Sequence, residues 1–313
     1  MKILLIRLSA LGDLVIMTSL LEYLKDKGEI TLITKKKYFE LFEKDPRVSR
    51  LVDEKNFNAI KHEKFDIACD LHAKPKTIIK LLKLRASKKC LINKRAIQRR
   101  LSVWFKKDIK EVPLYKLYTR PFHRFFEDHS YPIPSINIPF DESLRPLKRY
   151  IAVFPGASQV SKRWPLEYFL EVSRMVYEKY SIPSVYLGAE DIKLPDAPYV
   201  ADLMGTKPLS YIINTEKFAT FVLSNDSGPA HIAAAVNTPL FVIFGPTIPE
   251  FGFRPVSKAP VYLFERKDLS CRPCSLHGEK KCKYGDLRCL RGITPSIVLD
   301  KIDEFFKRYI TLR

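Results

Sequence analysis

The stretch ATFVLSNDSGPAHIAAAVNTPLFVIFGPT (219–247) decides the fold class. Its two apolar runs, 219–226 and 239–247, are rich in Val, Ile and Phe and are typical of buried strands. Between them, residues 228–236 have the composition of a short helix. Strand, helix and strand in this order predict a βαβ unit, in which the two strands run parallel and helices cover the sheet.

The same alternation continues in both directions from this unit. The pattern predicts further strands at 2–8, 29–34, 50–53, 65–71, 150–156 and 184–190, and helices at 14–27, 36–44, 164–180, 209–217 and 294–309. A Pro-rich stretch at 131–146 interrupts the alternation and is the best linker candidate. We therefore predict an α/β chain of two Rossmann-like domains, residues 1–146 and 147–313, with a last helix that can pack back on the N-terminal domain.

The charge of the chain predicts an anionic partner. The 313 residues carry a formal net charge of +19. Residues 61–124 alone hold 19 Lys plus Arg against 5 Asp plus Glu, a net of +14. Within them, KRAIQRRLSVWFKKDIK (94–110) has the pattern of a basic amphipathic helix.

Three classes of protein fit this charge. One is an enzyme with an anionic substrate. A second is a nucleic-acid-binding protein, because Trp104, Phe105, Tyr115 and Phe122 lie among the basic residues and aromatic rings stack on bases. A recognisable RNA-binding motif does not accompany them. The third is a membrane-surface protein anchored by residues 94–110.

The N-terminal sequence MKILLIRLSALGDLVIMTSLL (1–21) is apolar with a basic start, as in a signal peptide. However, Arg7, Ser9 and Asp13 interrupt the apolar run, and a small-residue cleavage site does not follow. The uncharged apolar runs elsewhere fall short of the ~18 residues that a membrane span needs. We expect a cytoplasmic protein.

The turn between strand 219–226 and its helix suits a phosphate group. The strand ends at Asp226, Ser227 and Gly228 form the turn, and Pro229 opens the helix. Such a turn directs backbone N–H groups and the positive end of the helix dipole at one point. Ser227 can add a hydroxyl, and His231 lies one turn into the helix. A simple helix cap is the alternative, since Asp and Ser are favoured at that position.

Asp13 lies in the turn after the first predicted strand, at the end where α/β proteins form their sites. An N-cap for the helix predicted at 14–27 is the alternative interpretation.

The last four of the six cysteines have the spacing of a metal site. Cys271 and Cys274 form a CxxC pair, and Cys282 and Cys289 follow after seven and then six residues. Four thiolates at this spacing are compatible with structural zinc. Two disulfides or reduced thiols remain open as alternatives.

Several motifs together resemble one family. The run 226–247 resembles the signature of the lipopolysaccharide heptosyltransferases, inverting glycosyltransferase family 9. Further similar stretches, in the right order, are 3–21, 154–165, 187–191, 203–209 and 271–299. The resemblance covers both halves, and only about 75–147 lacks a recognisable motif. It implies the GT-B fold, in which two Rossmann-like domains face each other across a cleft.

The resemblance also implies a reaction and its partners. Such enzymes transfer heptose from an ADP-heptose donor to the Kdo-bearing inner core of lipopolysaccharide, a strongly anionic lipid held in the N-terminal half. This agrees with the charge of residues 61–124 and implies a peripheral location on the cytoplasmic face of the inner membrane. Neither a nucleic-acid partner nor a cofactor is expected. The same machinery acting on another nucleotide sugar is the alternative.

By resemblance, Asp13 is the general base that deprotonates the acceptor hydroxyl, and Gly12 gives the acceptor room. Lys162 contacts the donor diphosphate and offsets the charge that grows on departing ADP. The basic residues expected at the acceptor are Lys94, Arg95, Arg99 and Arg120.

The remaining donor-binding residues come from the second half. They are Ser158, Glu190 on the ribose, Asp226, Ser227, Gly228 and His231, with 203–207 bordering the adenine. The chain between Glu190 and Leu203 is short and Pro-rich where the family pattern predicts a full helix. A DxD pair in a metal-binding context is also missing, so we expect metal-independent transfer and, at most, a structural metal in the cysteine tail.

Overall fold

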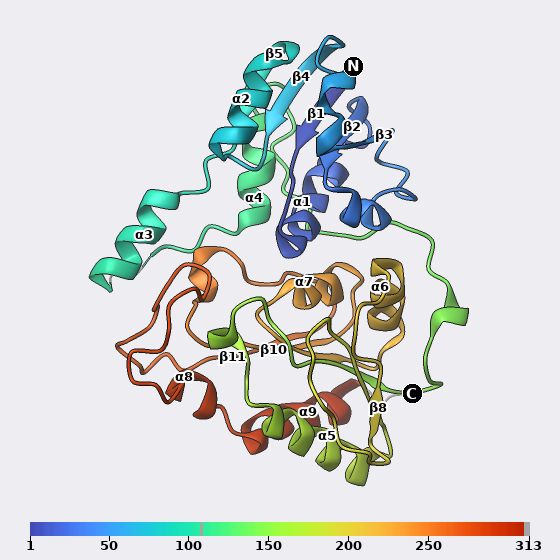
Figure 1. Ribbon diagram of the computed structural model, residues 1–313, viewed down its shortest axis with the longest axis vertical. Helices are drawn as coiled ribbons and strands as arrows, with labels where there is room; N and C mark the ends of the chain where they lie inside the picture. The colour runs from blue at the N-terminus through green and yellow to red at the C-terminus, as the bar shows by residue number, and fades with distance from the viewer. Residues whose placement is uncertain (107–108, 310–313) are drawn as a thin grey trace. The chain divides into compact units, whose positions relative to one another are not determined.

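The computed structural model describes residues 1–106 and 109–309, which form two compact units (Figure 1). Unit 1 comprises residues 1–96 and 112–140, and unit 2 comprises residues 97–111 and 141–313. The boundary at 140/141 lies close to the predicted division at 146/147. Residues 97–111, which we expected in the N-terminal domain, belong instead to unit 2.

Unit 1 is built on a parallel five-stranded sheet with the strand order β3-β2-β1-β4-β5. Its strands are β1 (Lys2–Ile6), β2 (Glu29–Thr34), β3 (Arg50–Asp53), β4 (Lys64–Asp70) and β5 (Arg85–Leu91), and its α-helices are α1 (Leu11–Leu24), α2 (Pro75–Lys83) and α4 (Leu114–Thr119). The central strand β1 is the apolar run KILLI, and its last four residues are completely buried. The central strand of this sheet is therefore accessible only near its ends.

Several elements of unit 1 differ from the sequence prediction, which did not include α2 and α4. The helix expected at 36–44 is a 3₁₀-helix, Lys36–Leu41. The edge strand β5, with the sequence RASKKCL, was not predicted, because it is mostly exposed and lacks an apolar alternation. Its pairing with β4, rather than its own composition, makes it a strand.

Unit 2 is built on a parallel six-stranded sheet with the order β11-β10-β9-β6-β7-β8. Its strands are β6 (Ile151–Phe154), β7 (Ser184–Tyr186), β8 (Val200–Asp202), β9 (Val222–Asn225), β10 (Leu240–Ile243) and β11 (Val261–Phe264). Its α-helices are α3 (Ala96–Phe105), α5 (Leu166–Tyr180), α6 (Leu209–Phe218), α7 (Gly228–Ala235), α8 (Arg288–Arg291) and α9 (Pro295–Tyr309). The 219–247 stretch is thus the predicted βαβ unit, β9-α7-β10.

Two hydrophobic clusters hold the unit 2 sheet between its helices. Side chains that alternate along β6, β9 and β10 pack on α5 and α9 on one face and on α6 and α7 on the other (Figure 1). The last helix, which we expected could return to the N-terminal domain, inserts Phe305 and Phe306 into the first of these clusters. Between Glu190 and Leu203 the chain forms the short strand β8 and no helix, as its Pro-rich sequence suggested.

The predicted helix 94–110 is shorter in the structure. It is α3, Ala96–Phe105; residues 107–108 of the prediction lie outside the described part of the chain, as do residues 310–313.

Glu216 on α6 is a charged residue type inside the core of unit 2. Its side chain is completely buried, and neither carboxyl oxygen makes a well-formed hydrogen bond with the described residues. Burial raises the pKa of Glu216 well above its usual value of 4.5, and the backbone N–H of Ala233 offsets this only in part. The folded protein therefore holds Glu216 in its protonated form.

This burial predicts a pH-dependent stability. Because the pKa of Glu216 is raised in the folded state, its contribution to the free energy of unfolding is fully present below the unfolded-state pKa. This contribution falls by up to about 1.4 kcal/mol per pH unit as the pH rises above that value. Urea unfolding of the native protein and of Glu216→Gln, measured from about pH 5 to about pH 8, checks this. The variant should gain stability relative to the native protein as the pH rises, and a constant difference would contradict the prediction.

Candidate functional site

The end of β9 in unit 2 carries a buried ion pair. The Lys162 ammonium lies 2.5 Å from a carboxylate oxygen of Asp226, and the Thr247 hydroxyl donates a hydrogen bond of 2.8 Å to the same oxygen. Burial alone would raise the pKa of Asp226, but Lys162, Thr247 and the nearby His231 outweigh it and lower the pKa. Asp226 is therefore charged at neutral pH and holds the lysine in a fixed position.

Asn225 determines where Lys162 lies. Its side-chain oxygen accepts a hydrogen bond of 2.9 Å from the Trp164 backbone N–H, and its amide donates one of 2.8 Å to the Pro155 carbonyl. Asn225 is completely buried, so both bonds are shielded from water. The loop after β6 is thereby tied to the end of β9, which brings Lys162 to Asp226.

The turn before α7 does not behave as an ordinary helix cap. Ser227 occupies the N-cap position, but its side chain makes no capping hydrogen bond with the described residues. Its hydroxyl lies 3.3 Å from that of Ser224, and the Asp226 carboxylate bonds Lys162 instead. The first residue of the helix is Gly228. The side chains thus favour the anion-binding interpretation of this turn over the capping one.

Glu190 packs tightly on two glycines. A Cβ atom at Gly156 would lie 2.1 Å from a Glu190 carboxylate oxygen, and one at Gly188 would lie 2.7 Å from it. The Arg163 guanidinium is 3.9 Å from the other oxygen. The loops after β6 and β7 therefore meet at this carboxylate, while Ser158 is exposed on the first of them.

The cysteine-bearing segment 271–299, called the tail below, packs against the loops that carry Lys162 and Thr247. A Cβ at Gly278, whose φ is +84°, would lie 2.6 Å from the Lys162 side chain, and the Ser161 hydroxyl donates to the Gly278 carbonyl. Arg272 donates to the Thr247 carbonyl at 2.8 Å. The tail therefore packs directly on Lys162 and fixes the loop that carries Thr247.

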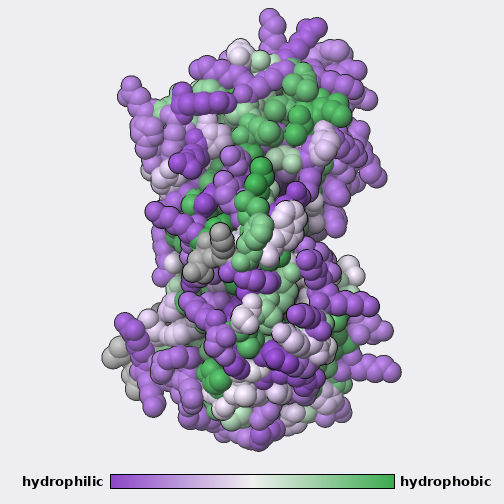
Figure 2. Space-filling view, turned by 90° about the vertical axis from the view of Figure 1, so that its left-hand side faces the viewer, coloured by the Kyte–Doolittle hydropathy of each residue, from purple (hydrophilic) through white to green (hydrophobic). Residues whose placement is uncertain are grey.

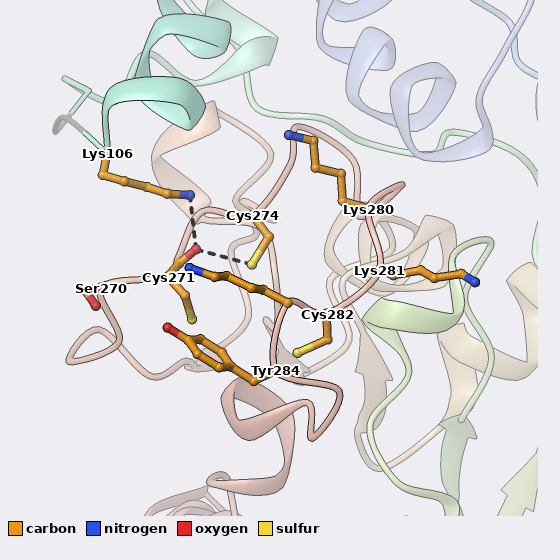
Figure 3. Close-up of a pocket in the computed structure, with 9 residues that line it drawn as sticks. Lys106, Ser270, Cys271, Cys274, Lys280, Lys281, Cys282 and Tyr284 are labelled. Atoms are coloured by element: carbon orange, nitrogen blue, oxygen red, sulfur yellow. Dashed lines mark hydrogen bonds between the residues drawn. The ribbon is translucent and has the colours of Figure 1, made fainter.

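The thiols of the tail are free (Figure 3). Cys271, Cys274 and Cys282 line a cavity of about 330 Å³, in which the Lys106 ammonium donates to the Cys271 carbonyl at 3.1 Å. Burial raises the pKa of the Cys289 thiol to about 11. Among the described residues, no group of three or more His, Cys, Asp or Glu side chains is placed to hold a metal ion. The zinc interpretation of the cysteine spacing is not supported by this geometry.

In unit 1, Arg7 and Tyr118 hold Asp13 in place. Helix α1 begins at Leu11 after the N-cap residue Ala10, so Asp13 lies in its first turn beside Gly12 and is not the cap. The Arg7 guanidinium lies 2.6 Å from one carboxylate oxygen, and the Tyr118 hydroxyl donates to the other at 3.1 Å. The carboxylate is thus fixed at the carboxyl end of β1 while its side chain stays 22% exposed.

Basic groups surround this carboxylate. Arg7 is buried and also donates to the Leu71 carbonyl at 2.7 Å, and the Lys94 ammonium donates to the His72 carbonyl at 3.0 Å. Burial, followed by the charge of Arg7, lowers the pKa of Lys94 to about 7 and that of His72 to about 4. The surroundings of Asp13 therefore favour an additional negative charge.

The predicted acceptor residues fall into separate places. Lys94 lies near Asp13. Arg95 and Arg120 line a cavity of about 620 Å³ together with Lys89 and Arg124. Arg99 does not join them: it lies on α3 in unit 2, is 6% exposed, and its guanidinium lies 5.1 Å from the centre of the Phe253 ring.

Sequence reasoning missed several partners of the predicted residues. They are Arg7 and Tyr118 at Asp13, Thr247 at Asp226, and Asn225 and Arg272, which hold the loops around the Lys162–Asp226 pair. Two had a usable signal, because Arg7 directly follows β1 and Thr247 ends the 226–247 run. The others contact their partners only through the tertiary fold.

The family model of glycosyltransferase family 9 (heptosyltransferase) matches residues 135–284. Over this segment, which is just under half of its length, the chain is similar to glycosyltransferase family 9. Lipooligosaccharide heptosyltransferase 2 of Haemophilus influenzae is 29% identical to this chain over 170 residues, which cover 50% of the chain and 47% of the relative. The match thus spans about half the length of this relative.

Solved structures extend the likeness to the whole chain. Escherichia coli ADP-heptose heptosyltransferase II matches with a TM-score of 0.75 at 19% identity, covering 98% of this chain and 99% of that one. The glycosyltransferase family 9 protein from Veillonella parvula matches with a TM-score of 0.73 at 21% identity, covering 97% and 96%. With two parallel, helix-covered sheets, the predicted α/β GT-B fold is confirmed.

The buried pair predicts a stability effect that a double-mutant cycle can measure. Lys162→Met should destabilise unit 2 by about 3–5 kcal/mol, because it leaves the Asp226 carboxylate buried without its cation. Adding Asp226→Asn should recover most of this loss. Urea unfolding at neutral pH checks both variants, and equal destabilisation by the single and double variants would show that the pair is not coupled.

Proposed function

We propose that this chain is an inverting heptosyltransferase that moves heptose from ADP-heptose to the Kdo/heptose inner core of lipopolysaccharide. The buried Lys162–Asp226 pair beside the N-terminus of α7 carries the proposal, because it offers a fixed cation and backbone N–H groups at one point. The relatives support the choice of sugar, since the family is named for heptosyl transfer and its curated relatives are heptosyltransferases.

In this proposal unit 2 binds the donor. The diphosphate lies against Lys162 and the first turn of α7, with Ser158 and Ser227 as hydroxyl donors and Glu190 on the ribose. As the bond between the sugar and the diphosphate breaks, negative charge grows on ADP. Lys162 is already held in place by Asp226, so it offsets this charge without reorganising. In this proposal Lys162 supplies the cation for the leaving group, and no step uses a metal ion.

Unit 1 supplies the base and the acceptor site. The acceptor hydroxyl gives its proton to Asp13 while its oxygen attacks the anomeric carbon, and ADP leaves from the opposite side with inversion. Arg7 and Tyr118 bond the two oxygens of Asp13 and so fix its orientation toward the hydroxyl. Together, these two contacts hold the Asp13 carboxylate in one orientation.

Lys94 and the basic cavity of Arg95 and Arg120 would bind the acid groups of the acceptor. Four of the nine residues lining this cavity are cationic, which suits carboxylates and phosphates on a Kdo-bearing lipid. The same machinery using another nucleotide sugar is the second candidate. No helix of the described residues is long and apolar enough to cross a membrane. We propose that the enzyme works as a peripheral protein on the cytoplasmic face of the inner membrane.

Replacing the base tests the reaction. Asp13→Asn should lower turnover of ADP-heptose on a Kdo-bearing lipid by about 10²–10⁴-fold, because the amide cannot accept the proton. The thermal shift caused by ADP should persist in this variant and exceed that caused by UDP or GDP.

Asp26→Asn is the matched control, because Asp26 is an exposed carboxylate just beyond the end of the same helix. Near-normal turnover in Asp13→Asn would remove Asp13 from the mechanism. A larger shift with UDP than with ADP would favour the second candidate.

The titration of Lys94 predicts a pH effect on acceptor binding. With a pKa of about 7, Lys94 loses its positive charge as the pH rises through neutrality. The KM for the anionic acceptor should therefore rise several-fold between about pH 6 and pH 8.5, whereas the KM for the donor should change less. Lys94→Gln should flatten this dependence, and an unchanged pH profile in that variant would exclude Lys94 from the acceptor site.

A further inference from the structure

Helix α3 packs on unit 2 with one face only. Arg99, Ser102 and Val103 are 6%, 3% and 6% exposed, and these positions share one side of the helix. Arg99 lies over the Phe253 ring. Beyond the last residue of the helix, Lys106 donates to the Cys271 carbonyl. The helix is therefore anchored along its inner face and just after its C-terminus.

The opposite face carries four large hydrophobic side chains. Ile97, Leu101, Trp104 and Phe105 are 71%, 42%, 66% and 64% exposed. Their spacing places them within an arc of roughly 100°, directly opposite the packed face. Single exposed hydrophobic residues are common, but four aligned on one helix form a contiguous apolar surface that indicates an interaction site.

The surroundings of this apolar stripe are basic. Arg100 is exposed on the helix, Lys106 follows it, and Lys280, Lys281 and Lys283 line the same cavity as Lys106. Figure 2 looks at the side of the molecule on which α3 lies in Figure 1 and shows hydrophobic atoms at the surface among hydrophilic ones. Aromatic and aliphatic residues on one face with cations beside them are the composition of helices that lie in a membrane interface.

Charge complementarity favours an anionic lipid surface over a second copy of this chain. Two copies meeting through α3 would bring two strongly basic segments together, which is electrostatically unfavourable. An anionic bilayer attracts the same cations by about 1 kcal/mol each and offers an apolar layer for the exposed rings. The helix is already folded and anchored, so binding costs little ordering.

We propose that α3 is a membrane-docking helix, which inserts Ile97, Leu101, Trp104 and Phe105 into the surface of an anionic lipid bilayer. The inference deepens the proposed function by naming the element that brings the enzyme to a lipid-linked acceptor. Vesicle binding itself does not depend on transfer, so the two ideas can fail separately.

The chain contains a spectroscopic probe for this contact. Its two tryptophans are Trp104, which is 66% exposed, and Trp164, which is 1% exposed. Vesicles of phosphatidylcholine with roughly one-third phosphatidylglycerol should shift the emission of the native protein to shorter wavelength. Trp104→Phe should abolish the shift, because the buried Trp164 already lies in an apolar environment. A shift that persists in Trp104→Phe would overturn the proposal.

Flotation with the same vesicles tests the whole stripe. The quadruple variant I97S/L101S/W104S/F105S should bind at least about tenfold more weakly, since it loses the buried apolar area. Ile297→Ser, at a 45% exposed position on α9, is the matched control and should bind like the native protein. Asp13→Asn should also bind normally, and the quadruple variant should keep its turnover on a delipidated, soluble acceptor.

Three results would overturn the proposal. One is undiminished flotation of the quadruple variant. Another is native binding that shows no preference for the anionic vesicles over vesicles of phosphatidylcholine alone, whether both bind equally or neither binds. The third is a concentration-dependent dimer in sedimentation that the quadruple variant abolishes, which would assign the stripe to self-association.

Discussion

The ion pair between Lys162 and Asp226 is the contact on which the proposed donor site depends. Removing two charges from water is costly, and only close, well-bonded geometry compensates for it. Here the geometry comes from four separate segments: the end of β9, the loop after β6, Thr247 and the tail that packs on Lys162. Each segment is part of unit 2, so its fold provides the whole arrangement.

In unit 1 the proposed base, Asp13, is also held by a cation and a hydroxyl group. Arg7 at the end of β1 and Tyr118 on α4 fix Asp13, just as Lys162 and Thr247 fix Asp226. Both carboxylates lie at the carboxyl ends of parallel strands, where the loops of α/β proteins gather functional groups. In unit 1 the carboxylate of Asp13 takes part in the proposed chemistry. In unit 2 the carboxylate of Asp226 instead positions Lys162, which is the group that takes part. One structural pattern thus serves two roles.

The excess positive charge is divided between distinct tasks. Lys94 is half-buried near Asp13, Arg95 and Arg120 line a cavity, and Arg99 packs inside unit 2 on Phe253. The sequence places all four in one basic segment, but the fold gives each a different environment. The apolar face of α3 lies in that same segment, so the proposed lipid-binding and acceptor-binding residues are close together in the sequence.

The sequence by itself determined the alternation of strands and helices, the βαβ unit at 219–247 and the motifs of family 9, because these depend on local periodicity and turn residues. It did not reveal β5, whose strand character comes from pairing with β4, or the partners of the predicted site residues. Asp13 and Tyr118 are 105 positions apart, and Asn225 and Trp164 are 61 apart. Local pattern carries no information about which distant side chains will meet. Only the tertiary structure sets these contacts, buries Glu216 and partly shields Lys94 from water, so it alone decided the charge and geometry of each group.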